Sequence, residues 1–201
     1  MPLQNRVTPF GDIIAVSKRG TFMGNRGIIH DPSTRTLLKR RWSTRAWIIC
    51  VCDFRNVRRA VMARQSWTEL FFLDEATALS AGHRPCFYCQ RQRAKAFQAA
   101  WADGTTKPSA PEMDRVLHAE RLEGNGGKKH HPLATAILDL PDGSMIASGD
   151  NAYLVHRGQT YLWSWDGYAA CPPPTKDISL LTPPSTVRAL AAGYIPVVLG
   201  I

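Results

Sequence analysis

The most constraining part of this chain is segment 71–89, in which a short helical pattern runs into a Cys-x-x-Cys pair. Asp74 is a typical N-cap residue, and an alanine-rich stretch of helix formers follows it. Gly82 stands where the left-handed residue that ends a helix is expected. The pattern therefore predicts one helix between Asp74 and Gly82 and a second helix over 90–101, directly after the cysteine pair.

The pair itself, Cys86 and Cys89, has the spacing with which two thiolates bind one metal ion. A helix N-terminus lowers the pKa of nearby thiols and so favours the thiolate form that binds metal. Cys50 and Cys52 lie upstream in a predicted strand over 46–54. Because residues i and i+2 of a strand share one face, both could face the pair and complete a four-thiolate zinc site.

Two alternatives to that four-cysteine site remain open at this point. The first is a mixed site in which His83 or another histidine replaces one of the upstream thiols. The second is no metal at all, with Cys50 and Cys52 as small buried residues on the core face of their strand.

The region over about residues 50–101 resembles the metal-binding module of Ada-type DNA-repair proteins. In that family an aromatic pair leads into an alanine-rich helix, followed by Gly-aromatic-Arg-Pro-Cys-x-x-Cys and a basic helix. The matching residues are Phe71, Phe72, Glu75, Ala76, Ala81, Gly82, Arg84, Pro85, Cys86 and Cys89. The resemblance implies a zinc ion, DNA in preference to RNA as partner, and a link to DNA repair or modification.

The chain departs from the family at the other two zinc ligands, which the family carries in an upstream Cys-x-x-x-Cys pair. One cysteine of that pair accepts a methyl group from damaged DNA. Here the upstream cysteines are in the order Cys50-Val51-Cys52, so methyl transfer is not expected.

Charge is distributed unevenly along the chain, whose formal net charge is +9. Residues 1–60 hold 12 Lys or Arg against three Asp, whereas residues 101–201 hold eight basic and ten acidic residues. The arginines expected to contact phosphates are Arg40, Arg41, Arg45, Arg58, Arg59 and Arg84. Tryptophans interleaved with them could stack on bases. The pattern favours a nucleic-acid partner, although a basic surface that meets an acidic protein is an alternative.

A second cluster of polar residues follows the metal motif. On a predicted helix over 112–122, Asp114 and His118 share a face, and a glycine loop then brings two histidines back. General acid–base chemistry could use His118, Glu120, His130 and His131. The alternative is an ordinary polar helix followed by a solvated basic loop.

The remaining pattern predicts an α+β protein in two packed parts. Residues 1–104 would form the basic, Ada-like zinc module, with a mixed hairpin and helix arrangement. Residues 105–201 would form a small antiparallel β-meander with strands near 134–140, 144–148, 152–156 and 160–165, then a C-terminal helix.

No apolar run reaches the roughly 18 residues of a membrane span, and the N-terminus lacks an apolar signal core. We therefore expect a cytoplasmic protein without membrane contact, in which cysteines serve as ligands or buried thiols rather than disulfides.

Three functions follow as expectations. The first is a zinc-containing nucleic-acid-binding protein. The second is a nuclease or a base- or damage-processing enzyme that uses His118, Glu120 and His130. The third is a non-catalytic module for protein interaction.

Overall fold

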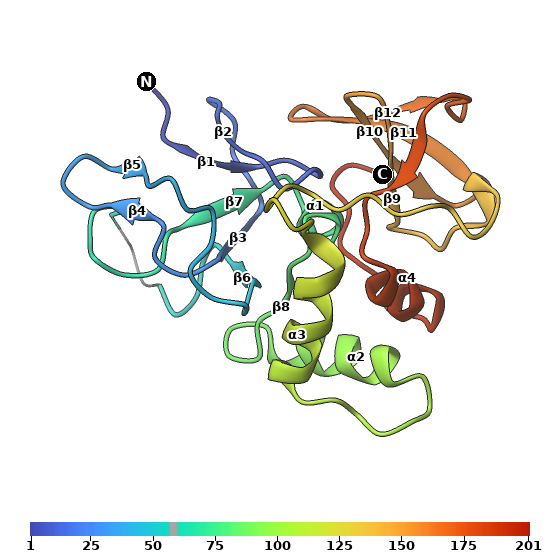
Figure 1. Cartoon of the computed structure of the whole chain (residues 1–201), viewed down its shortest axis with the longest axis horizontal. Coiled ribbons are helices and arrows are strands. Elements are labelled where there is room, and N and C mark those ends of the chain that lie inside the picture. The colour runs from blue at the N-terminus through green and yellow to red at the C-terminus, as the bar shows by residue number, and fades with distance from the viewer. Residues whose placement is uncertain (57–59) are drawn as a thin grey trace.

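The structure is a computed structural model that describes residues 1–56 and 60–201. It is a mixed α+β fold, as predicted, with two main sheets and four α-helices among the described residues (Figure 1). None of these helices is long and apolar enough to cross a membrane.

The first sheet has the strand order β2-β1-β7-β3-β6-β8 and is built from the N-terminal half of the chain. Its strands are β1 (Gln4–Val7), β2 (Ile13–Ala15), β3 (Phe22–Asn25), β6 (Ile48–Val51), β7 (Leu70–Phe72) and β8 (Arg84–Pro85). Most neighbours are antiparallel, but β1 with β7 and β6 with β8 are parallel. A separate two-stranded ribbon contains β4 (His30–Asp31) and β5 (Thr36–Leu37).

The second sheet has the order β12-β11-β10-β9-β13 and contains the predicted meander. Its strands are β9 (Met145–Ser148), β10 (Asn151–His156), β11 (Gln159–Ser164), β12 (Gly167–Cys171) and β13 (Ile178–Leu180). The strand expected over 134–140 is wrong, because that segment contains only a 3₁₀ turn, η1 (Ile137–Asp139). Its place beside β9 is taken by β13, which pairs antiparallel with β9.

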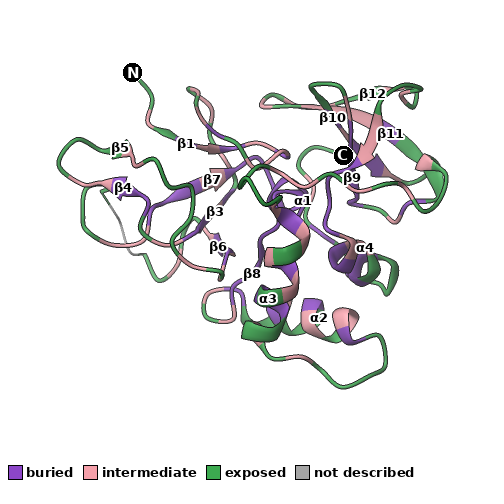
Figure 2. Ribbon diagram, in the orientation of Figure 1, coloured by how far each residue is buried: buried purple, intermediate pink, exposed green. Residues whose placement is uncertain are grey.

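The four α-helices are α1 (Glu75–Ser80), α2 (Arg91–Ala102), α3 (Ala110–Arg121) and α4 (Pro184–Ala191). α1 begins and ends as the sequence predicts: the Asp74 side chain accepts from the Thr77 backbone N–H, and Gly82 has φ +85°. α1 is also buried along its whole length, between the two sheets (Figure 2).

The core runs through both halves of the chain. Ala189 and Leu190 of α4 pack in the cluster that holds Phe72 of the first sheet. Ala76 of α1 packs in the cluster under the meander. The boundary predicted near residue 104 thus lies between the strands of the two sheets in the sequence. The two sheets still share a packed core, because α4 packs with the first sheet and α1 packs under the meander.

Gly24 shows how tightly the strands of the first sheet approach one another. A Cβ atom at this position would lie 2.1 Å from the Ile48 carbonyl oxygen and 2.9 Å from the Phe72 ring. Glycine is needed here for close backbone approach, and the residue lies within β3 rather than in a turn. This close approach fixes the position of β6, which carries Cys50.

Candidate metal centre

The candidate site is built where β6 and β8 lie side by side in parallel. Ile49 pairs with Pro85 across the two strands, and the Cys86 backbone N–H donates to the Ile49 carbonyl oxygen at 2.9 Å. The Gln90 side chain donates to the same oxygen at 2.9 Å, just before α2 begins. The turn that holds the Cys-x-x-Cys pair is therefore fastened to the strand that carries Cys50.

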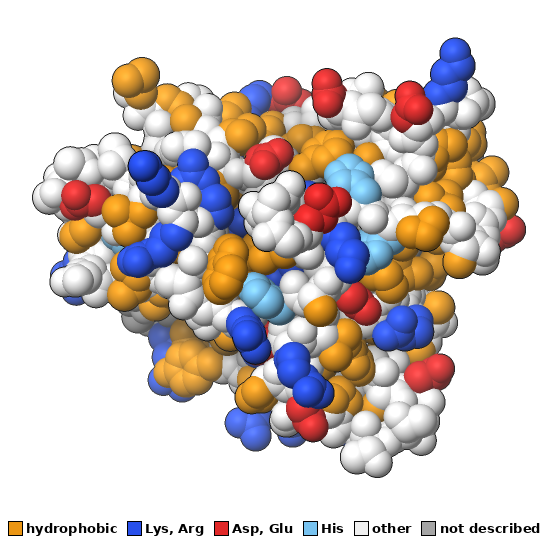
Figure 3. Space-filling view, in the orientation of Figure 1, with side chains coloured by type: hydrophobic (Ala, Val, Ile, Leu, Met, Phe, Trp, Pro, Cys, Tyr) orange, Lys and Arg blue, Asp and Glu red, His pale blue; other side chains and the backbone are white. Residues whose placement is uncertain are grey.

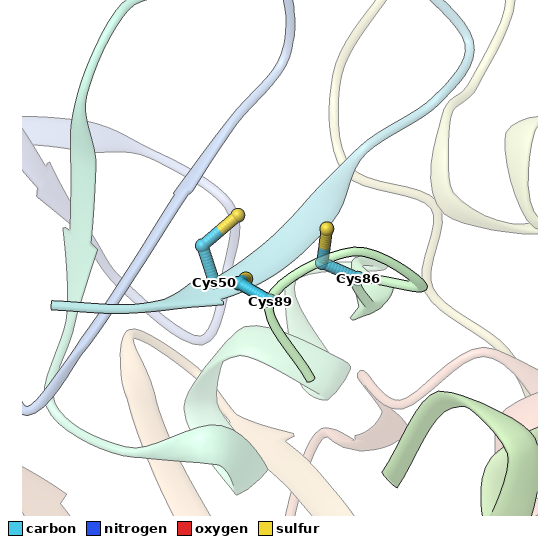
Figure 4. Close-up of side chains that lie close together, drawn as sticks. All are labelled: Cys50, Cys86 and Cys89. Carbon is cyan, nitrogen blue, oxygen red and sulfur yellow. The ribbon is translucent and has the colours of Figure 1, made fainter. Parts of the chain in front are cut away.

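This arrangement brings three thiols together, those of Cys50, Cys86 and Cys89 (Figure 4). Their sulfur atoms all lie within 4.8 Å of one another, so the three residues lie close enough to hold a metal ion. Cys50 and Cys86 are buried, and Cys89 is half-buried.

The thiols also share protons. Hydrogen bonds from the neighbouring thiols of Cys50 and Cys89 lower the pKa of Cys86. The pKa of Cys50 is raised because its thiol donates to the other two and is buried. A cation would replace these shared protons, because metal-bound cysteine is deprotonated.

Backbone N–H groups support negative charge on the sulfurs. The Tyr88 N–H donates to the Cys86 sulfur at 3.4 Å. Hydrogen bonds from the Cys50 thiol and the Val51 N–H favour the Cys89 thiolate, but the pKa of Cys89 is raised overall because of the neighbouring Cys86 and burial. Zinc–sulfur bonds of about 2.3 Å place the sulfurs of a tetrahedral site about 3.8 Å apart, so a small contraction of this group would fit zinc. Donor type and spacing thus agree with zinc at three of the four predicted positions.

Cys52, the fourth predicted ligand, lies outside the group. β6 ends at Val51, so the strand geometry that should carry Cys50 and Cys52 on one face does not extend to the second residue. The Cys52 side chain is exposed and its sulfur lies 3.4 Å from the Thr21 carbonyl oxygen. The expected four-cysteine set is therefore reduced to three, with Cys52 nearby.

His83, the alternative ligand, is also absent from the group. It is fully buried, and its Nε2 accepts from Arg26 Nε at 3.2 Å. Burial and the neighbouring Arg26 and Arg121 lower its pKa well below the usual value. His83 is therefore a neutral core residue that packs between the rings of Trp47 and Phe72.

The three thiols line a cleft of about 970 Å³, together with Cys52. Two carboxylates, those of Asp53 and Glu69, also line it. Glu69 is buried and accepts from the Met62 backbone N–H at 2.9 Å. The cysteine group is thus open to a space large enough for a ligand.

Two aromatic residues and an arginine stand beside the thiols. The Tyr88 side chain lies between the two cysteines of the motif in sequence and is 70% exposed. Its ring packs edge-on against Phe54 at 5.2 Å, and the Arg55 guanidinium lies 5.6 Å from its centroid. Neither Phe54 nor Tyr88 was predicted as a site residue. For Tyr88 the sequence did offer a signal, because an aromatic residue stands between the two cysteines of the Cys-x-x-Cys motif.

The predicted phosphate-binding arginines divide into three sets. Arg40, Arg41 and Arg45 are exposed, in agreement with a surface role. Figure 3 shows that Lys and Arg side chains lie in several separate groups on the face drawn. Arg58 and Arg59 lie outside the described residues.

Arg84 is a correction to the predicted set, because its side chain is 6% exposed and fully engaged. It makes a bidentate ion pair with Asp114, with Nε–Oδ1 at 2.8 Å and Nη2–Oδ2 at 2.7 Å. This pair joins β8 to α3, so Arg84 is a structural residue rather than a phosphate ligand.

The predicted acid–base cluster on α3 is also spread among structural contacts. Glu120 Oε2 accepts from the backbone N–H and hydroxyl of Ser185, which holds the start of α4. His118 packs edge-on against Trp42 at 4.7 Å, and His131 Nε2 lies 2.7 Å from the Glu120 carbonyl oxygen. His130 contacts the Ser179 hydroxyl at 2.7 Å. These side chains do not converge on one point, and among the described residues only the cysteine group has metal-site spacing.

No protein-family model, curated protein or solved structure matches this chain.

Proposed function

We propose that this chain is a zinc-containing nucleic-acid-binding protein whose zinc is held by Cys50, Cys86 and Cys89. The observation that supports it is the convergence of three thiols from two separate segments at the wall of a large cleft. Thiolate ligands from a Cys-x-x-Cys turn and a neighbouring strand are typical of zinc. The Ada-like sequence of segment 71–89 adds a preference for DNA over RNA.

Nucleic-acid binding is supported by the residues beside the thiols. Phe54 and Tyr88 offer ring faces to unstacked bases, and Arg55 supplies positive charge beside both rings. The exposed Arg40 and Arg41 extend the basic surface. A single strand that follows such a surface would combine stacking with phosphate neutralisation.

The metal part of the proposal is tested by zinc content. Protein purified without chelator should carry about one zinc per chain, and Cys50→Ser should lose it. Cys171→Ser is the matched control, because that cysteine lies on β12, outside the group. Cys52→Ser tests whether Cys52 is the fourth ligand. If the variant keeps its zinc, the fourth coordination position is not filled by Cys52; if the variant loses its zinc, Cys52 moves into the site when the metal binds. Wild-type protein without zinc would refute the metal proposal.

The nucleic-acid part is tested separately by salt-dependent binding of a single-stranded oligonucleotide. Replacing Arg40 and Arg41 together with Gln should weaken binding and reduce the salt slope by about 0.7 for each phosphate that is no longer neutralised. Tyr88→Ala should cost about 1–3 kcal/mol of binding without changing that slope. Lys107→Gln, an exposed residue outside the cleft lining, is the control. Absence of binding at low salt, in protein that holds zinc, would leave only the metal proposal standing.

A second candidate function is favoured by the count of thiols. Three protein ligands at a cleft are typical of a catalytic rather than a structural zinc, and zinc deaminases of nucleobases can use three cysteines. A bound zinc supplies an activated water at its open position. Glu69, buried in the wall of the same cleft, would be the residue that holds a proton. Hydrolytic release of ammonia from a nucleobase, lost in Glu69→Gln while zinc is retained, would establish this candidate.

A further inference from the structure

A second polar site lies away from the cysteines, around the buried ring of Trp47. The guanidinium carbons of Arg26 and Arg121 lie 3.8 Å and 3.9 Å from the centroid of that ring. The two side chains are 2% and 1% exposed, which makes them the largest fully buried side chains of the described structure. Two arginines stacked on one ring are held close together despite their like charges.

These cations have no carboxylate partner among the described residues. None of the ion pairs found there includes Arg26, Arg121 or Lys128. Asp114 attracts Arg121 but is already bound through both oxygens to Arg84. Asp12 attracts Arg26 from an exposed position.

Hydrogen-bond donors of both arginines are also unsatisfied. Arg26 Nη2 and Arg121 Nε are buried and have no hydrogen-bond partner in the part of the chain that the structure describes. Arg26 does donate from Nε to His83, and Arg121 donates from Nη1 to the Gly82 carbonyl oxygen at 3.0 Å. The unsatisfied donors are therefore specific atoms of side chains that are held in place through other nitrogens.

A small cavity of about 90 Å³ is lined by the two residues that carry these donors. Arg26, Trp47, Arg121 and Lys128 line it, and Arg41 and Asp12 are also in its wall. Lys128 is half-buried and its Nζ donates to the Ser80 carbonyl oxygen. The volume exceeds the requirement of a single water molecule, so the cavity has room for a small ion.

The charge balance of this site is unfavourable without a negative ligand. Buried charges cost free energy unless they are paired and hydrogen-bonded. Burial and the neighbouring Arg121 lower the pKa of Arg26 to about 9. Burial and the neighbouring Arg84 lower the pKa of Arg121 to about 9, so both side chains are still charged at neutral pH. Four cations face one exposed carboxylate in the cavity wall.

We propose that this cavity is a binding site for a phosphate-type oxyanion, held by Arg26, Arg121 and Lys128. Guanidinium donors in fixed positions match the oxygens of a phosphoryl group, and Lys128 adds a point charge. The anion would satisfy Arg26 Nη2 and Arg121 Nε and neutralise the buried charge. The site stands independently of the proposed zinc centre, because it uses none of the cleft residues. Arg41, in the cavity wall, is the residue that it shares with the proposed nucleic-acid surface.

The test is titration of the full chain with inorganic phosphate at constant ionic strength, with chloride as the reference anion. We expect saturable binding of one phosphate per chain and a rise in Tm that chloride does not produce. Lys128→Met should weaken binding at least tenfold. Lys129→Met is the matched control, because Lys129 is the next residue, does not line the cavity, and should leave affinity unchanged.

Asp12→Asn supplies a variant with the opposite sign. Removing the one carboxylate of the cavity wall should strengthen phosphate binding several-fold. Lys128→Met removes a charge from a half-buried position, so both variants are expected to fold. Equal losses in Lys128→Met and Lys129→Met, or no phosphate-specific binding by the wild type, would overturn the proposal.

The pH dependence gives an independent check with sulfate, whose charge is constant over the range. Burial, Arg26 and Arg121 lower the pKa of Lys128 to about 7. His83 and His130 also face this lysine but have lowered pKa values, so they stay neutral above pH 7. A bound anion favours the protonated lysine, so sulfate affinity should fall as pH rises from 7 to 8, a range below the pKa of about 9 of Arg26 and Arg121. The fall should be absent in Lys128→Met, and an equal fall in both proteins would contradict the assignment.

The source of the phosphoryl group is resolved by comparing probes. A 5′-phosphorylated oligonucleotide that binds more tightly than its unphosphorylated form, with the difference lost in Lys128→Met, would identify a nucleic-acid end as the ligand. Binding of inorganic phosphate without any such difference would identify a free anion.

Discussion

The turn before α2 and the helix α3 both carry residue types that can bind metal or transfer protons, but the two elements use them differently. In the turn, Cys86 and Cys89 leave their sulfurs facing Cys50 and the cleft. On α3, the Asp114 carboxylate is paired with Arg84, and the Glu120 carboxylate accepts a hydrogen bond from Ser185. Reactive residue types indicate a site only where their polar atoms converge and remain free of structural partners.

The largest effect should come from breaking the buried ion pair of α3. Asp114→Asn would leave the Arg84 charge buried without its partner, which typically costs about 3–5 kcal/mol of unfolding free energy. Urea unfolding measures the change. Glu123→Gln, an exposed residue just after α3, is the control and should change stability by less than about 0.5 kcal/mol. A cost below about 1 kcal/mol for Asp114→Asn would mean that the pair is not structural.

Metal removal should have the next largest effect and belongs to the turn. Free zinc at one hundred times its Kd stabilises the native state by about 2.7 kcal/mol relative to the metal-free state. Chelation should therefore lower the Tm of the wild type and of Cys171→Ser. Cys50→Ser should melt at the same temperature with and without chelator, and a chelator-dependent Tm in that variant would show that the metal lies elsewhere.

Glu120→Ala should cost about 1–2 kcal/mol, because it removes the acceptor for the backbone N–H and hydroxyl of Ser185 at the start of α4. Unfolding by urea gives the value, and zinc content should not change. Ser179→Ala, which removes the hydroxyl beside His130, tests whether any polar loss near α3 has the same effect. Unchanged stability with loss of an enzymatic activity would restore α3 as a catalytic helix.

His118→Ala should have the smallest effect, below about 1 kcal/mol. The half-buried ring would no longer pack on Trp42 or hydrogen-bond with Arg121, which lies at 3.1 Å. His118→Phe should restore the packing on Trp42 and part of the stability. Loss of nucleic-acid binding in both variants, without loss of stability, would assign the ring a direct role in recognition.

Local signals in the sequence were sufficient for α1 and the Cys-x-x-Cys turn. The cap that Asp74 forms with the Thr77 N–H and the left-handed conformation of Gly82 both lie within one helical turn, so the local sequence was enough to indicate them. The meander over β9 to β11 was predictable for the same reason, from alternation and short turns. β13 was not, because its pairing with β9 joins segments some thirty residues apart.

The candidate site was predictable to the level of residue type but not of geometry. Strand periodicity predicted Cys50 and Cys52 together as ligands. Because β6 ends at Val51, only Cys50 lies on the strand and in the cysteine group. The cations around Trp47 had no sequence signal. Arg26, Trp47 and Arg121 come from three distant segments, and only the fold shows that two arginines share one ring.

The parallel pairing of β6 with β8 has a consequence for the unfolded chain. Cys50 and Cys86 are neighbours in space but bracket a long segment that includes β7 and α1. A metal bound to both would close this loop of about 36 residues, and a crosslink that closes such a loop removes about 4 kcal/mol of chain entropy from the denatured ensemble. Binding a single ion would thereby shorten the conformational search for the segment that connects both sheets, so the metal would direct folding as well as ligand binding.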